Sequence, residues 1–168
     1  KKAKLINEVF LVSEVTTKEQ IAKLNYISEA VFQARDWVNE PGSSLTPSRF
    51  ADELIGLFRE QTDVKLSVLS PLQIKSLNMS GIVNVNKGSI NESRFVILDY
   101  MPEGIDTDSE AIVLIGKGIF FDTGGINLKP SAGLYEMKSD MAGAAVVAST
   151  LYLLSKLKIK TRVIGLIP

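Results

Sequence analysis

The stretch VLIGKGIFFDTGGINLKPSAGLYEMKSDMAGAAVV, residues 113–147, decides the predicted fold. It starts within an apolar run at 111–115, which predicts a buried strand. The loop at 116–140 then holds five of the chain's twelve glycines, and the small and apolar residues at 140–157 predict a closely packed helix. A glycine-rich loop between a strand and a helix is typical of α/β folds, in which ligands gather beyond the carboxyl ends of strands.

The rest of the chain alternates between strand and helix patterns. Further strands are predicted at 5–12, 64–69, 94–100 and 161–167. One helix is predicted to begin after Thr17, because Thr17 and Gln20 have the spacing of a capping box. A second is predicted to begin at Thr46-Pro47, and a short third helix at Ser70-Pro71, ending near Asn78. The buried face of the first helix is expected to consist of Leu24, Ile27, Val31, Ala34 and Val38. This order predicts an α/β layered fold with a largely parallel or mixed sheet flanked by helices.

Composition excludes several classes of site. The chain has 168 residues, enough for one domain, and 45% of them are hydrophobic, enough for a packed core. It contains no histidine and no cysteine, so a Ser-His-Asp triad, a cysteine nucleophile, a Cys/His zinc site and a disulfide framework are impossible within it. The 19 basic residues balance 19 acidic residues, which argues against a nucleic-acid surface or a polybasic membrane anchor.

The ends and the apolar segments give further expectations. No signal peptide is recognisable, and the nearly apolar stretch at 141–154 is too short to span a bilayer, so we expect a soluble cytoplasmic protein. An apolar strand such as 161–167 usually lies inside a sheet with further elements after it. We therefore expect the chain to be a fragment of a longer protein.

Four charged residues in the glycine-rich loop are candidates for a metal site. Asp122 and Asp140 occupy turn positions where glycines let the backbone bend tightly enough to aim both carboxylates at one point. Carboxylates can hold a pair of divalent cations that activates water and polarises a carbonyl group. Lys117 is a possible nitrogen ligand once it has lost its proton, which burial and a nearby cation both favour. Lys129, if it stays charged, could stabilise an oxyanion.

Other interpretations of these residues stay open at this point. Asp140 could cap the following helix, Asp122 could be an ordinary turn residue, and both lysines could be solvated surface charges. The dinucleotide-binding fingerprint fails because Phe121 stands where that motif needs glycine, although a phosphate site built from backbone amides remains possible. Spacing alone thus predicts no more than a possible divalent-metal site.

The segment at 113–147 resembles the metal-binding core of the leucyl (cytosol) aminopeptidase family. Upstream, ARDWVNEPGSSLTP at 34–47 resembles the entry into the catalytic domain of this family, and the closing TRVIGLIP at 161–168 also fits. The resemblance runs in register from about Val12 to the end of the chain. It implies that residues 1–15 are the end of an N-terminal domain or a linker, and that 16–168 are the N-terminal half of the metallopeptidase catalytic domain.

The resemblance also implies roles for individual residues. Lys117 matches an unusual lysine metal ligand, Asp122 a carboxylate that bridges two metal ions, and Asp140 a ligand of the tighter metal site. Lys129 matches a catalytic lysine that polarises the scissile carbonyl group. Met137 matches a methionine that lines the pocket for the first substrate side chain, although a core methionine is an equally good interpretation. The resemblance implies two divalent metal ions, zinc and/or manganese, as cofactors. It also implies that the full-length protein is a homo-hexamer and that it does not bind a membrane.

The implied reaction is hydrolysis of an N-terminal residue, leucine-like, from a peptide by a metal-bridged hydroxide. In the family, an Asn-Thr-Asp-Ala-Glu-Gly-Arg motif supplies the remaining aspartate and glutamate ligands and an arginine, and this chain lacks that motif. Three of five side-chain ligands are present, so we expect weak metal binding and little peptidase activity from this chain alone. The alternative function is a non-catalytic binding module on the same scaffold; nucleic-acid binding, known for some members, has no support in a net charge of zero.

Overall fold

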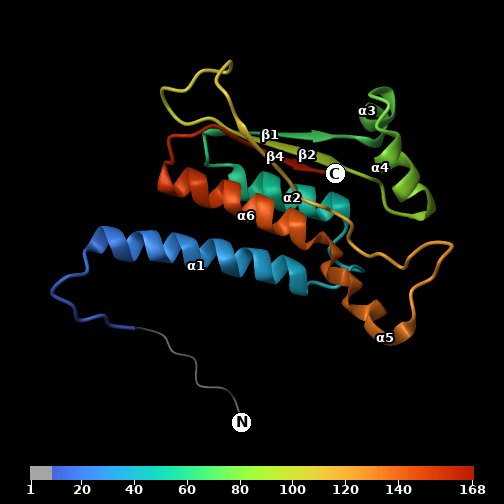
Figure 1. Ribbon diagram of the computed structural model, residues 1–168, viewed down its shortest axis with the longest axis horizontal. Helices are drawn as coiled ribbons and strands as arrows, with labels where there is room; N and C mark the ends of the chain where they lie inside the picture. Colours follow the sequence, from blue (N-terminus) through green and yellow to red (C-terminus); the bar gives the residue numbers. More distant parts are fainter. Residues whose placement is uncertain (1–8) are drawn as a thin grey trace, which may run out of the picture.

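The computed structural model describes residues 9–168 and has an α/β architecture, which confirms the predicted fold class (Figure 1). In chain order its elements are α1 Lys18–Asn39, α2 Pro47–Phe58, β1 Val64–Leu69, α3 Pro71–Ser76, α4 Ser80–Val85, the 3-10 turn η1 Asn86–Gly88, β2 Phe95–Tyr100, β3 Ile112–Ile115, α5 Ser131–Leu134, the 3-10 helix η2 Tyr135–Met141, α6 Ala142–Leu157 and β4 Val163–Ile167. The elements α4, η1, α5 and η2 were not predicted.

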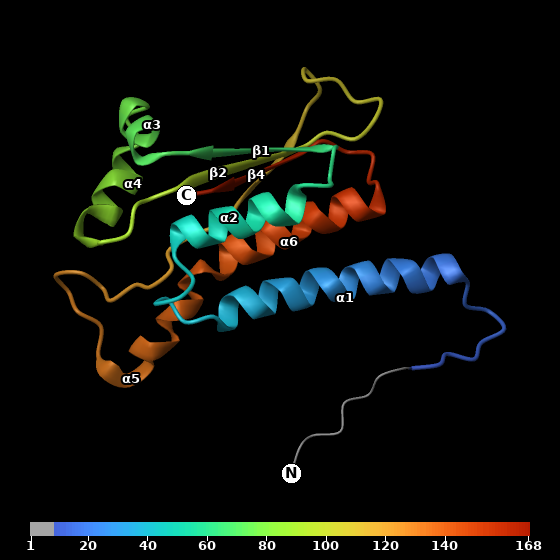
Figure 2. The same ribbon diagram turned by 180° about the vertical axis from the view of Figure 1, so that it is seen from behind.

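The four strands form one mixed sheet in the order β1-β2-β4-β3. The pairs β1–β2 and β2–β4 are antiparallel, and β3 runs parallel to β4. Helices α2 and α6 lie against one face of this sheet and α1 packs against α6 on the far side, so the described residues form three layers (Figures 1 and 2). The interior position of β4 agrees with the prediction for 161–167.

Local capping interactions explain where the helices begin. Thr17 and Gln20 form the predicted capping box, with Gln20 N–H donating to Thr17 Oγ1 at 3.2 Å and Thr17 N–H donating to Gln20 Oε1 at 2.9 Å. Thr46 caps α2 ahead of Pro47, and Ser70 caps α3 in the same way. The start of each of these helices is therefore determined by three or four neighbouring residues, as predicted.

The predicted buried face of α1 was right only toward the end of the helix. Ala34 and Val38 are partly buried and pack against the core, as predicted, but Leu24, Ile27 and Val31 are exposed, and the fully buried residues are Ala30 and Trp37. Trp37 packs edge-on against Phe50 of α2, with ring centroids 5.0 Å apart. The stripe that faces the core is thus set by where α2 and α6 contact the helix, and a long amphipathic pattern with apolar residues on several faces does not reveal that contact.

Two strand predictions also need correction. Of the strand expected at 5–12, residues 1–8 lie outside the described residues and residues 9–12 form no strand. The strand at 111–115 forms as β3 but is not buried: it is the edge of the described sheet, and Ile112, Val113 and Ile115 are exposed. An edge strand has a partner on one side only, so apolar composition alone did not place it.

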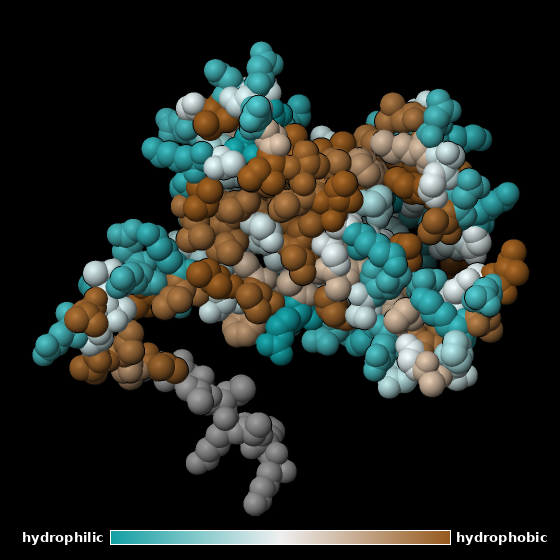
Figure 3. Space-filling view, in the orientation of Figure 1, coloured by the Kyte–Doolittle hydropathy of each residue, from teal (hydrophilic) through white to brown (hydrophobic). Residues whose placement is uncertain are grey.

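The part of one sheet face that β2, β4 and β3 form is mostly apolar and carries no helix among the described residues. Alternate residues of a strand point to opposite faces, and the pairing register puts five aliphatic side chains together on the face turned away from α6. We call this the outer sheet face; it consists of Ile97, Val113, Ile115, Ile164 and Leu166. Figure 3 shows apolar side chains gathered over the part of the molecule where the sheet lies.

None of the helices within residues 9–168 has both the length and the apolar character that crossing a membrane requires.

Candidate metal centre

A close approach between two glycines positions the first part of the loop. A Cβ atom on Gly116 would lie 2.5 Å from the carbonyl oxygen of Gly143, closer than two such atoms can come. The absence of both side chains lets the end of β3 touch the first turn of α6, where Ala144 N–H donates to the Lys117 carbonyl at 3.0 Å. Lys117 is thereby held beside the residues that precede α6.

The second part of the loop is a tight turn around Asp122. Gly124 and Gly125 have φ values of 95° and 69°, which glycine adopts without strain. The Gly124 N–H donates to Asp122 Oδ1 at 2.8 Å, and the Lys129 N–H closes the turn on the Thr123 carbonyl at 2.9 Å. The turn interpretation of Asp122 is therefore correct as a description of its backbone, and it leaves the second carboxylate oxygen free to bind Lys129.

The structure pairs each candidate lysine with one candidate aspartate. Lys117 Nζ lies 2.6 Å from both carboxylate oxygens of Asp140. Lys129 Nζ lies 2.7 Å from Asp122 Oδ2 and 3.1 Å from Met137 Sδ. All five predicted site residues therefore take part in two charged clusters, which the loop between β3 and α6 builds from segments 7 to 23 residues apart.

These contacts answer two of the alternatives. Asp140 does not cap α6, because the N-cap position is Met141 and no side chain caps it. The Lys117 side chain is 54% exposed, so the burial invoked to favour loss of its proton is not found, and its ammonium group is ion-paired with the Asp140 carboxylate.

The ion pairs shift the protonation equilibrium of Asp122. The hydrogen bond from the Lys129 ammonium, followed by the one from the Gly124 N–H, holds the pKa of the Asp122 carboxyl below its usual 3.8. Partial burial opposes this shift, and the positive charges of Lys129 and Lys117 add to it. The Lys117 charge therefore acts on both aspartates, which links the two clusters electrostatically.

The donor atoms fit a divalent cation in kind but not in number. Carboxylate oxygens and a neutral amine are ligands that zinc and manganese accept. In the structure the ammonium groups of Lys117 and Lys129 lie against the carboxylates of Asp140 and Asp122, where a cation would otherwise bind. Residues 9–168 contain no cluster of three or more acidic, histidine or cysteine side chains, so a complete shell of protein ligands would need donors from elsewhere.

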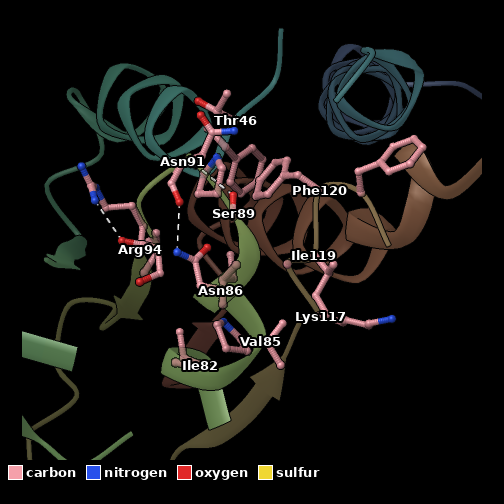
Figure 4. A pocket seen from close by; sticks show the side chains of 18 of the residues that line it. Thr46, Ile82, Val85, Asn86, Ser89, Asn91, Arg94, Lys117, Ile119 and Phe120 are labelled. Carbon is pink, nitrogen blue, oxygen red and sulfur yellow. Dashed lines mark hydrogen bonds between the residues drawn. The ribbon is translucent and has the colours of Figure 1, made fainter. Parts of the chain in front are cut away.

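A cavity of about 450 Å³ adjoins the lysine side of this centre (Figure 4). It lies at the carboxyl end of β4 and is lined mostly by apolar residues of α2, α4 and the 118–121 segment, with Lys117 on its wall. Polar residues that line it include Asn86, Ser89, Asn91 and Arg94. Arg94 lies at the start of the predicted strand 94–100, but the sequence analysis identified none of these residues as part of a site.

The comparison with family models decides which family this is. The cytosol aminopeptidase family catalytic domain matches residues 32–168. This chain belongs to the cytosol aminopeptidase family. The resemblance seen in the sequence is thereby confirmed.

Individual relatives of this cytosol aminopeptidase family member agree. The cytosol aminopeptidase of Rickettsia prowazekii is 39% identical over 155 residues, which are 92% of this chain and 30% of the relative. The solved bottromycin maturation enzyme BotP in complex with Mn superposes with a TM-score of 0.82 at 36% identity, over 90% of this chain and 32% of that one. The apo leucyl aminopeptidase from Trypanosoma cruzi gives a TM-score of 0.80 at 26% identity, over 87% and 28%. The chain thus spans about a third of the length of these relatives.

Proposed function

We propose that this chain contributes to a two-metal aminopeptidase site that hydrolyses N-terminal residues, leucine-like, from peptides. The observation that carries the proposal is the pairing of Lys117 with Asp140 and of Lys129 with Asp122 in one loop of a cytosol aminopeptidase family member. The family matches support the class of enzyme, and a relative solved in complex with Mn supports a divalent cation. The relatives' name also leads us to propose a cytosolic location.

Each charged residue has a distinct proposed role. Asp122 and Asp140 hold two divalent cations, zinc or manganese, and Lys117 donates its amine nitrogen after losing a proton. Bound cations supply Lewis acidity and an activated water. Lys129, as an ammonium group, would donate an N–H to the carbonyl oxygen on which negative charge develops. Met137 lies beside Lys129 and would line the pocket for the first substrate side chain.

A complete metal site needs further protein ligands. The outer sheet face indicates where a polypeptide segment that carries such ligands could pack. Five aliphatic side chains on this face are exposed or half-buried, which is costly in water. We propose that polypeptide equivalent to the unmatched part of the relatives packs here and supplies the missing acidic donors. The homo-hexamer implied by the sequence resemblance stays a prediction.

Titration of the purified chain with Mn²⁺, followed by calorimetry or by the EPR signal of free Mn²⁺, tests the proposed site. We expect weak binding that Asp122→Asn or Asp140→Asn reduces about tenfold or more, because a carboxylate ligand is lost. Asp52→Asn, an exposed acid on α2, is the matched control and should bind as the unmodified chain does. Equal affinity in all three variants would contradict the metal site.

Activity separates the enzyme from the non-catalytic binding module. We expect this chain to hydrolyse a leucyl amide poorly with Mn²⁺ or Zn²⁺ added, since two carboxylates leave the cations underligated. Addition of the polypeptide equivalent to the unmatched part of a relative should raise turnover, and Asp122→Asn should abolish that gain. Peptide binding without any metal dependence and without such a gain would favour the binding module.

A further inference from the structure

The Lys129 ammonium group has two partners of different chemical character. Asp122 Oδ2 lies 2.7 Å from Nζ, and the thioether sulfur of Met137 lies 3.1 Å from it. Asp122 belongs to the turn after β3, whereas Met137 belongs to η2. The ammonium is therefore held between two segments of the loop.

A thioether differs from a carboxylate as a partner for this group. Lysine has three N–H donors and no acceptor, and sulfur is a weak, polarisable acceptor that carries no net charge. Contact with Met137 can therefore orient the ammonium without neutralising it. In the proposed function the oxygens of Asp122 bind cations, so the carboxylate is no longer available to hold Lys129, while the sulfur still is.

The segment that carries the sulfur is itself anchored. The Lys138 ammonium donates to the Asn39 carbonyl at the end of α1 at 2.6 Å. The Ser139 hydroxyl donates to the Glu136 carbonyl at 2.7 Å, and Met141 at the end of η2 is fully buried. Met137 directly precedes Lys138 in η2, so its position is set by the packing of η2 against α1 and α6.

We propose that Met137 is a positioning residue for Lys129: its sulfur accepts a hydrogen bond from the ammonium and holds the charged end in place independently of Asp122. The purpose of this contact rests on the proposed function, because a positioned charge matters only if Lys129 faces a substrate carbonyl. The contact itself is seen in the structure and can be tested on the purified chain without added metal. A role in lining a pocket would need only the size of the side chain, whereas positioning needs an acceptor atom.

Hydrogen exchange of the lysine ammonium groups, followed by NMR of the ¹⁵N-lysine-labelled chain without metal, tests the proposal. Lys129→Arg assigns the signal. Met137→Leu keeps the apolar bulk but removes the acceptor, and exchange at Lys129 should become about twofold to fivefold faster, as expected for loss of a weak hydrogen bond. Met137→Gln restores an acceptor and should bring the rate back. Met101→Leu is the matched control and should have no effect.

Repeating the comparison in Asp122→Asn isolates the sulfur. The acceleration caused by Met137→Leu should then be at least as large, because the strong carboxylate partner is gone. Unchanged exchange at Lys129 in a folded Met137→Leu variant would overturn the proposal. If that variant does not fold, the ¹³Cε methyl signal of Met137 serves instead: it should shift on Lys129→Met while that of Met101 stays, and no shift would overturn the proposal equally.

This outcome is separable from that of the proposed function. The Mn²⁺ titration tests Asp122 and Asp140 as ligands and involves no statement about Met137. Ammonium exchange is measured without metal or substrate. A failed metal titration with a positive exchange result would leave the Met137 contact in place as a property of the fold, and the reverse result would remove only the positioning role.

Discussion

Replacing Gly116 with alanine should destabilise this chain although only one methyl group is added. The new Cβ would lie 2.5 Å from Gly143 O, 2.8 Å from Gly143 C and 2.9 Å from Ala144 Cα, all backbone atoms at the start of α6. The two segments must separate by roughly one ångström, and overpacking of this kind costs about 1–3 kcal/mol. Lower entropy of the unfolded chain offsets about 0.4–1 kcal/mol of this cost. We expect a net loss of about 1–2 kcal/mol in the free energy of unfolding.

Urea unfolding followed by circular dichroism measures this loss. Gly56→Ala is the matched control, because a Cβ added there would meet no atom within 4 Å beyond its chain neighbours and the backbone of its own helix, α2. Alanine in a helix interior is favoured over glycine by about 0.5–1 kcal/mol, so this variant should be more stable than the unmodified chain. The two substitutions should thus move the midpoint in opposite directions. A midpoint for Gly116→Ala at or above that of the unmodified chain would refute the close-approach argument.

Three further predictions concern single groups. Because the pKa of the Asp122 carboxyl is lowered in the folded chain, its ion pair with Lys129 should stabilise the fold above pH 3.8, and this contribution should be lost as the pH falls through the pKa of the folded state. Lys129→Met should raise the pKa of Asp122, which a ¹³C-carboxyl NMR titration measures. Tyr100→Phe removes a 2.7 Å hydrogen bond to the Ile159 carbonyl and should cost about 1–2 kcal/mol in urea unfolding. Arg162→Lys keeps the charge but loses the bidentate hydrogen bonds to the Asp99 carboxylate in β2, so the midpoint of thermal unfolding should fall. An unchanged midpoint would show that the bidentate geometry does not contribute to stability.

The starts of α1, α2 and α3 and the presence of most strands were predictable because they depend on residues close in sequence. The Thr17–Gln20 capping box lies within four residues, and so does the Thr46-Pro47 start of α2. An alternating apolar pattern likewise marked β1, and short apolar runs marked β2 and β4. Burial was less predictable: the exposed face of α1 and the exposed edge strand β3 carry apolar residues that only the tertiary arrangement distinguishes from core residues.

The candidate site divides in the same way. Composition excluded histidine and cysteine chemistry and pointed to four charged residues in the glycine-rich loop. It did not say which lysine pairs with which aspartate, because Lys117 and Asp140 are 23 residues apart and meet only through the backbone contact at Gly116 and Gly143. The contact between Met137 and Lys129 had no signal in the sequence at all, since it depends on the unpredicted turn η2.

By itself, then, the sequence determined the fold class, the starts of α1, α2 and α3 and the kinds of chemical group available to the site, since each follows from local preferences or from which residue types are present. Only the tertiary structure decided which aliphatic side chains are covered and how the loop charges pair. The reason is physical: the energies of packing and of ion pairs depend on distances between segments that are far apart along the chain, and those distances are set by how the sheet and the helices pack together.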